Sequence, residues 1–297
     1  MLTRLVLLLL ICSFVCADEK PAVKLFDRSN LVAWCIVPFD SKNRSPADRA
    51  EMVKKLGFTR VAYDWRDTHV ASFEDEILQY KKHGLDYFAF WSTHEKAFEL
   101  FAKHDLHPQI WQTAPSPPAG SDPDARVAAA VKQLMPLVER TAKAGCKLGL
   151  YNHGGWGGEP ENLVAVCKML REKHDAKHVG IVYNLHHAHD RIRDFEASLA
   201  SMKPYLLCLN LNGMATAGDR IGQKILPLGA GEHDVAMLKI IRDGGYNGPI
   251  GIIGHTNDDV EQRLQDNLDG LDWLLPQLDG KAAGAKPVYR TFKPAMK

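Results

Sequence analysis

The feature that most constrains this chain is a regular alternation of two kinds of segment, strand-like and helix-like, that begins near residue 31. Short runs rich in β-branched and aromatic residues are followed by longer stretches with apolar residues at helical spacing. Strict alternation of this kind favours a parallel sheet covered by helices, and eight units close into a (β/α)8 TIM barrel, an α/β fold with one domain. The expected strands cover residues 31–39, 60–65, 86–92, 108–112, 147–151, 179–185, 205–211 and 249–254.

An open doubly wound sheet is the alternative architecture for a chain of this texture. That fold usually has a glycine-rich phosphate loop after its first strand. Here the first expected strand ends in Pro38-Phe39-Asp40, without such a loop. The barrel is therefore the favoured prediction.

The 297 residues divide into three segments. Arg4 precedes an apolar run over residues 5–15, and Val15 and Ala17 are small residues at the spacing of a cleavage site, which predicts a signal peptide over 1–17. The run of about 11 residues is too short to cross a bilayer about 30 Å thick. We therefore expect export to the periplasm or the cell exterior, with no membrane attachment after cleavage. The other two segments are a barrel over 18–278 and a basic, disordered tail over 279–297.

Charge and cysteine patterns limit the partners and cofactors. The formal charge of the chain is +1, and removal of the signal peptide with Arg4 brings it to about zero. Residues 279–297 carry +4, so the expected barrel over 18–278 carries about −4. Such a barrel is a poor nucleic-acid binder, because phosphate contacts supply most of that affinity. The remaining cysteines match no zinc or redox spacing, so we expect buried free thiols at Cys35, Cys146, Cys167 and Cys208.

The carboxyl ends of the expected strands concentrate histidine, asparagine and tryptophan, and this end of a barrel holds the active site. Aromatic faces suit sugar C–H surfaces, amides bind hydroxyls, and histidine transfers protons, so we expect a small carbohydrate ligand. His153 and His187 are the catalytic candidates, expected to share a cavity with Asn184 and Trp91. The substrate-binding candidates are Trp34, Asp64, Trp91, Gln112, Asn152, Trp156, Asn184, Asn210, Asn212 and His255.

Three histidines follow the strand expected over 179–185. Strand alternation predicts that His187 and His189 face one side and His186 faces the other.

Four segments, taken in this order along the chain, carry a family resemblance: YNHGGW at 151–156, VGIVYNLHH at 179–187, LPLGAGEHD at 226–234 and GYNGP at 245–249. Together they resemble the xylose-isomerase-like TIM barrel family, which includes sugar-phosphate isomerases, epimerases and endonuclease-IV-type enzymes. The resemblance covers roughly residues 30–276. It implies a barrel with a divalent metal at the ends of strands five to eight, commonly held by Glu, Asp, His and Glu.

The sequence departs from that ligand set. The strand-five Glu is Tyr151, the strand-six Asp is Asn184, the strand-seven region reads NLN over 210–212, and the strand-eight Glu is Gly254. A hard divalent ion needs anionic oxygen ligands. We therefore expect no cofactor and no stoichiometric magnesium, manganese or cobalt.

A zinc ion is the softer alternative, because imidazole suits zinc. If a divalent metal such as zinc, manganese or cobalt is present, its ligands are expected to be His153, His187 and His255.

These observations leave two functions open. The first is an exported sugar isomerase or epimerase, or a keto-sugar lyase, that abstracts a proton next to a carbonyl with His153 or His187 as base. Free or keto sugars are favoured over sugar phosphates, since no basic phosphate clamp is evident. The second is a non-catalytic carbohydrate-binding barrel that has lost the family metal site. The oligomeric state stays open.

Overall fold

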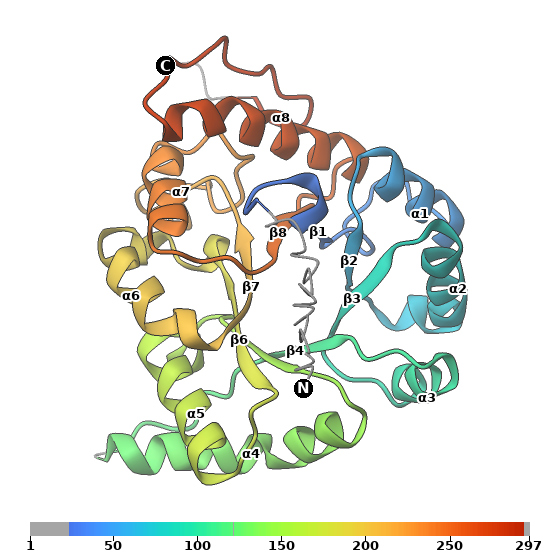
Figure 1. Ribbon diagram of the computed structural model, residues 1–297, viewed down its shortest axis with the longest axis vertical. Coiled ribbons are helices and arrows are strands. Elements are labelled where there is room, and N and C mark those ends of the chain that lie inside the picture. The colour runs from blue at the N-terminus through green and yellow to red at the C-terminus, as the bar shows by residue number, and fades with distance from the viewer. Residues whose placement is uncertain (1–23, 121, 294–297) are drawn as a thin grey trace, which may run out of the picture.

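The computed structural model describes residues 24–120 and 122–293. Within them, eight parallel strands form a closed barrel in chain order, and the helices surround it (Figure 1). The predicted fold is confirmed. The strands are β1 Leu31–Trp34, β2 Arg60–Tyr63, β3 Asp86–Trp91, β4 Gln109–Thr113, β5 Leu148–Tyr151, β6 Val179–Asn184, β7 Leu206–Leu211 and β8 Ile250–Ile253. The helices are α1 Pro46–Lys55, α2 Phe73–His83, α3 Glu95–His104, α4 Pro123–Lys143, α5 Pro160–Lys173, α6 Phe195–Met202, α7 Asp234–Asp243 and α8 Val260–Leu278.

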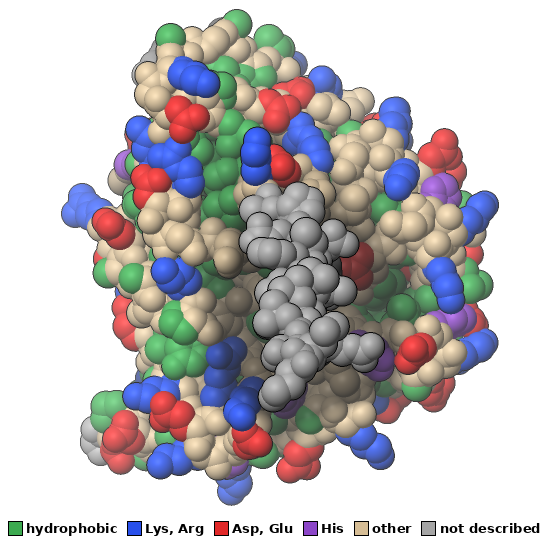
Figure 2. All heavy atoms as spheres, viewed as in Figure 1, with side chains coloured by type: hydrophobic (Ala, Val, Ile, Leu, Met, Phe, Trp, Pro, Cys, Tyr) green, Lys and Arg blue, Asp and Glu red, His purple; other side chains and the backbone are tan. Residues whose placement is uncertain are grey.

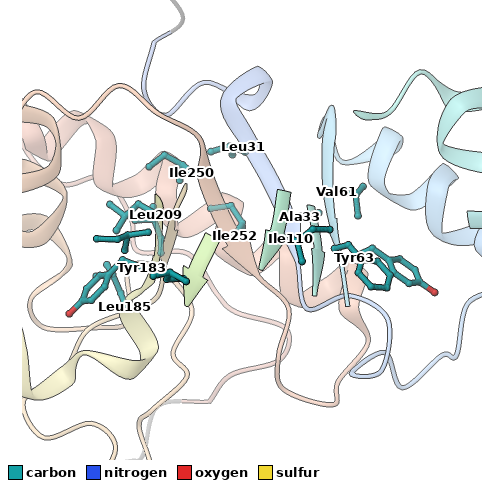
Figure 3. Packing of buried hydrophobic residues seen from close by; sticks show 14 of the residues in the cluster. Leu31, Ala33, Val61, Tyr63, Ile110, Tyr183, Leu185, Leu209, Ile250 and Ile252 are labelled. Atoms are coloured by element: carbon teal, nitrogen blue, oxygen red, sulfur yellow. The ribbon is translucent and has the colours of Figure 1, made fainter. Parts of the chain in front are cut away.

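The strands are apolar on both faces because both faces are covered. Alternate residues such as Leu31, Ala33, Ile250 and Ile252 point outward and pack under the helices (Figure 3). The other residues fill the barrel interior, among them Trp34, whose strand closes the barrel by pairing β1 with β8. The sequence pattern of short continuous apolar runs follows from this double burial.

Bulky side chains fit inside the barrel because neighbouring positions are small. A Cβ at Gly149 would lie 2.5 Å from Val182 Cγ2 and 3.0 Å from Trp111 Cδ1. A Cβ at Gly251 would lie 1.7 Å from Asn210 Oδ1. Any larger residue at either glycine would displace one of these interior side chains.

The first strand is shorter than the apolar run that predicts it. β1 ends at Trp34, and Cys35 follows with φ 56°, in the left-handed region that few residues other than glycine adopt. Ser92 has φ 60° at the equivalent point after β3. Such positions cluster at functional sites, and both of these stand at the carboxyl end of the barrel.

The C-terminal segment differs from the expected disordered tail. Residues 281–293 have no regular secondary structure, but they pack against α8 and the loop before α7 (Figure 1). The Tyr289 hydroxyl donates to Leu228 O at 2.8 Å, and Arg290 donates to Asp266 at 3.0 Å and to Asp269 at 2.7 Å. The basic residues that suggested a solvated tail are thus partly paired with acids of α8.

Two further expectations concern cysteines and membranes. The four cysteines in the described ranges are unpaired and buried, as expected. Among the described residues, no helix combines the length and apolar character needed to cross a bilayer.

One face of the molecule carries lysine, arginine and acidic side chains interspersed over the outer helices (Figure 2). The predicted signal segment over 1–17 lies outside the described residues.

Candidate active site

A cavity of about 270 Å³ opens at the carboxyl ends of the strands. Its size is near the lower end of small-molecule pockets and suits a monosaccharide better than a longer saccharide. It is built from residues at or just after the ends of six different strands, so no single segment defines it. The described residues that line it are Trp34, Cys35, Phe39, Asp64, Arg66, Trp91, His153, His186, His187 and His255.

Four imidazoles share this cavity. The ring centroids of His153 and His187 are 4.7 Å apart, and those of His186 and His187 are 3.8 Å apart. His255, after β8, lies 5.9 Å from His186. The predicted approach of His153 and His187 arises because β5 and β6 are neighbours in the barrel.

The predicted alternation of the three histidines after β6 is wrong. The chain does not continue as a strand but forms a short 3-10 helix over Leu185–His187, which turns both His186 and His187 to the cavity. His189 instead lies buried elsewhere, with Nδ1 3.0 Å from Ala215 O and Nε2 2.9 Å from Lys224 O. It holds the loop after β7.

The four imidazoles are held neutral by their surroundings. Burial, and then the other imidazoles and Lys224, lowers the pKa of His187 to about 3. Burial likewise lowers the pKa of His255 to about 4, lowers that of His153, and takes that of His186 well below its ordinary value. At neutral pH each ring can therefore donate one hydrogen bond and accept another.

Asp64 brings a carboxyl group to the same cavity from the end of β2. Its Oδ1 accepts the Val37 N–H at 3.2 Å, while its buried Oδ2 has no hydrogen-bond partner within the described ranges. Burial raises the pKa of Asp64 to about 7. Burial and the nearby carboxyl raise the pKa of Cys35, so its thiol stays protonated. Asp64 is thus a carboxyl that titrates near neutrality with one oxygen free.

Aromatic rings form much of the wall. The ring centroids of Trp34 and Trp91 are 5.8 Å apart, and Trp91 lies 6.2 Å from His153. Phe39 packs against His255 at 3.6 Å. Flat apolar faces beside hydrogen-bonding groups are the combination that a sugar requires.

Several predicted site residues serve the fold and do not line this cavity. Asn152 Nδ2 donates to Asn184 O at 3.0 Å, and Asn152 Oδ1 accepts the Asn184 N–H at 2.7 Å. The Asn184 side-chain amide donates to the Tyr151 hydroxyl inside the barrel. The expectation that Asn184 joins His153 and His187 at the cavity is therefore wrong, because its amide ties β6 to β5.

The other outlying candidates have equally local roles. Asn210 lies inside the barrel, where its Oδ1 is 3.5 Å from Cys208 Sγ, and Asn212 Nδ2 donates to Lys224 O at 2.9 Å. Trp156 packs under Arg126, whose Cζ is 4.8 Å from the ring. Gln112 is outside the cavity lining because its neighbour Trp111 takes the inward position on β4.

Four lining residues were not among the predicted site residues. Arg66 and His186 lie just after strand ends, which the sequence predicts, but the sequence does not show that their side chains point into the cavity. Cys35 and Phe39 reach the cavity because the left-handed Cys35 ends β1 early and turns the chain. No sequence pattern signals that turn.

The residues at the family metal position do not fit a hard divalent ion. Tyr151 OH accepts the Trp34 Nε1 proton at 3.3 Å and the Asn184 amide, and Gly254 offers no side chain. These groups bring no negative charge to offset the lost hydration of the ion. Within the described ranges, no three His, Cys, Asp or Glu side chains are arranged as a metal site. His153, His187 and His255 are among these side chains, so zinc binding by the three would require them to move and stays a prediction.

Comparison with solved structures shows many with the same fold. A 3-keto-D-glucoside 4-epimerase from E. coli has a TM-score of 0.60 and 16% identity, covering 83% of this chain and 99% of that chain. D-Psicose 3-epimerase with D-tagatose, from Clostridium cellulolyticum H10, has a TM-score of 0.57 and 12% identity, covering 84% and 99%. The IolI protein with a bound zinc atom has a TM-score of 0.64 and 11% identity, with 84% and 99% covered.

No curated protein matches the chain. The family model described as xylose isomerase-like TIM barrel matches residues 66–277, which is more than half of the chain. The motifs at 151–156, 179–187, 226–234 and 245–249 lie within that match. The chain therefore belongs to the xylose isomerase-like TIM barrel family.

Proposed function

We propose that this protein is a sugar isomerase, epimerase or keto-sugar lyase that removes a proton from the carbon next to a carbonyl. The observation that carries the proposal is the unpaired, buried Oδ2 of Asp64 in the same small cavity as the neutral imidazoles of His153 and His187. The sugar epimerases among structures of similar fold support the same substrate class.

Asp64 is assigned as the base. A general base works best when its pKa is close to the operating pH, and burial brings the pKa of Asp64 to about 7. The sequence predicts His153 or His187 as the base, and the surroundings of these rings argue against that role. The lowered pKa of His187, about 3, makes it a weak base but keeps it neutral, so that it can donate a hydrogen bond.

Asp64 and His187 follow strands on opposite sides of the closed barrel. In the closed barrel, β2, which leads to Asp64, is separated from β6, which leads to His187, by three strands on either side. A substrate held between them would present its C–H bond to Asp64 and its carbonyl oxygen to the imidazole N–H groups. Donors aimed at the developing oxyanion stabilise the enolate-like transition state.

Proton abstraction by Asp64 gives an enolate-like intermediate, from which each product follows. The Asp64 carboxylate takes the α-proton, the C–H electron pair forms the enol double bond, and the carbonyl electrons move to the oxygen that His153 or His187 holds. Delivery of a solvent proton to the other face of the same carbon gives an epimer, and Asp64 then releases its proton to solvent. Delivery of the proton to the former carbonyl carbon gives an isomer, because the hydroxyl on the deprotonated carbon passes its proton to the enolate oxygen and becomes the new carbonyl. Loss of a β-leaving group gives the lyase product.

The aromatic walls position the sugar. Trp34 and Trp91 offer faces on which C–H surfaces can pack, and the cavity of about 270 Å³ has room for one ring. Holding the reacting atoms in one geometry contributes several kcal/mol to rate acceleration in general.

A non-catalytic carbohydrate-binding barrel is the second candidate. It is favoured by the neutral groups at the family metal position, Tyr151 and Asn184, which bind each other.

We also propose that the protein acts outside the cytoplasm, because its first 17 residues have the pattern of a signal peptide.

The test is product analysis by NMR after incubation with D-fructose, D-psicose, D-tagatose and 3-keto-glucosides. Turnover of at least one sugar, lost in Asp64→Asn and reduced in His187→Gln, supports the enzyme. Binding of a sugar without any turnover supports the second candidate instead.

A further inference from the structure

A guanidinium group stands at the mouth of the cavity. Arg66 lines the cavity and follows Asp64 by two residues. Its Cζ lies 5.3 Å from the centroid of the Phe39 ring, and its Nη1 donates to Trp65 O at 2.7 Å. These two contacts hold the planar group at the rim of the cavity.

Most of the donor capacity of Arg66 is unused. A guanidinium has five N–H donors, and the hydrogen bond to Trp65 O is the one that its side chain makes to described residues. No carboxylate in the described ranges lies within 4.0 Å of it, whereas Arg44, Arg49 and Arg140 each form such an ion pair. The positive charge of Arg66 is therefore not held in an ion pair with any described residue, although it is close enough to Asp64 to lower the pKa of that carboxyl.

One acidic side chain, the proposed base, opposes an anion in the lining around Arg66. Asp64 is the one acid among the described lining residues, and its free oxygen is buried. The Nδ1 of His186 is also buried without a partner in the described structure, which leaves a further polar atom for a ligand. The ammonium of Lys224 lowers the pKa of the lining histidines and so adds positive potential.

We propose that the substrate carries an anionic group, a carboxylate or a phosphate monoester, which Arg66 binds at the mouth of the cavity. This inference rests on the proposed function and specifies the substrate class of the same site. It replaces the expectation from sequence of an uncharged sugar, because the position of Arg66 at the cavity is not visible in the sequence. The planar fork of arginine matches the two oxygens of a carboxylate or phosphate, and such charge-assisted pairs are among the strongest hydrogen bonds. A neutral sugar would leave these donors to water.

The experiment is a titration by intrinsic fluorescence, because Trp34 and Trp91 line the cavity. D-Glucose, D-glucuronate and D-glucose 6-phosphate are compared, with D-galactose, D-galacturonate and D-galactose 6-phosphate as a second set. Wild type, Arg66→Gln and Arg66→Lys are measured at pH 7.5 and low salt. Arg193→Gln is the matched control, since Arg193 is an exposed arginine outside this cavity.

We expect at least one charged sugar to bind about 10- to 100-fold more tightly than its neutral parent, as a charge-assisted hydrogen bond allows. Arg66→Gln should remove that difference, Arg66→Lys should keep part of it, and Arg193→Gln should behave as wild type. Preference for the uronate identifies a carboxylate, and preference for the phosphate ester identifies a phosphate.

Equal binding of charged and neutral sugars, or an Arg66→Gln variant that keeps the preference, would overturn this inference and leave the proposed function standing. Failure of all six sugars to bind would also overturn this inference, whereas the proposed function is decided separately by the turnover test with keto-sugars. Thermal unfolding of each variant shows whether the fold is kept.

Discussion

The imidazole rings of His153 and His187 lie 4.7 Å apart, although the two residues follow different strands. Burial lowers the pKa of both residues, and the neighbouring His153 ring lowers the pKa of His187 further. The cluster therefore acts as a set of neutral hydrogen-bonding groups at physiological pH. This is the property that the proposed stabilisation of a carbonyl oxygen requires.

The neutral histidines should make the protein sensitive to acid. The folded-state pKa of His187 is lowered to about 3, so between about pH 6.5 and 3 the unfolded chain binds a proton that the folded chain does not. Stability should fall as the pH falls through this window. We expect His187→Asn to lessen the fall in Tm between pH 7 and pH 4.5, measured by circular dichroism. His174→Asn, at an exposed position, should leave the slope unchanged.

Asp64 should have the opposite dependence. Its folded-state pKa is raised to about 7, so between about pH 4 and 7 the folded chain holds a proton that the unfolded chain has lost, and stability falls as the pH rises. We expect Asp64→Asn to raise the stability at pH 8, by up to roughly 4 kcal/mol, and to change it little at pH 4.

Thermal or urea unfolding at both pH values measures the effect of Asp64→Asn. Asp105→Asn is the control, because Asp105 is exposed and asparagine also tolerates its left-handed backbone, φ 53°. Equal stability of Asp64→Asn and wild type at pH 8 would contradict a buried, unpaired carboxyl at this position.

The barrel could be predicted from sequence because its signals are local. Each strand is a short apolar run and each helix has its own apolar spacing, so the order of elements is visible without any knowledge of tertiary contacts. The convergence of His153, His187, Trp91 and Asp64 follows from the same order, since the fold brings strand ends together.

The direction of side chains beyond the strand ends could not be predicted in the same way. His186 faces the cavity because a 3-10 helix replaces the strand period, and Phe39 reaches it because Cys35 adopts φ 56°. Asn152 and Asn184 bind each other across neighbouring strands, a pairing that depends on register. These outcomes depend on tertiary contacts that no single segment encodes.

Metal content is a separate prediction. Because Tyr151, Asn184 and Gly254 supply no anionic oxygen, we expect the dialysed protein to hold no stoichiometric magnesium, manganese or cobalt by elemental analysis. One equivalent of manganese or cobalt that disappears in His187→Gln would show that this reading of the ligand positions is wrong. One equivalent of zinc would support the imidazole site of His153, His187 and His255.

Export gives a further prediction. The apolar run over 5–15 after Arg4 should be removed near Ala17 when the full chain is produced in a secreting host. Intact-mass measurement of the exported protein should give a species that begins near Asp18. A protein recovered outside the cytoplasm that still begins at Met1 would contradict cleavage.

Solvent exchange shows whether Asp64 removes a proton next to a carbonyl. The protein is incubated in D₂O with each keto-sugar, and deuterium at the carbon beside the carbonyl is followed by NMR. We predict incorporation by wild type at a rate that rises with pH through about 7, with a loss on the order of 10²-fold or more in Asp64→Asn. Incorporation that Asp64→Asn leaves unchanged, or a sugar that binds and never exchanges, would contradict the account.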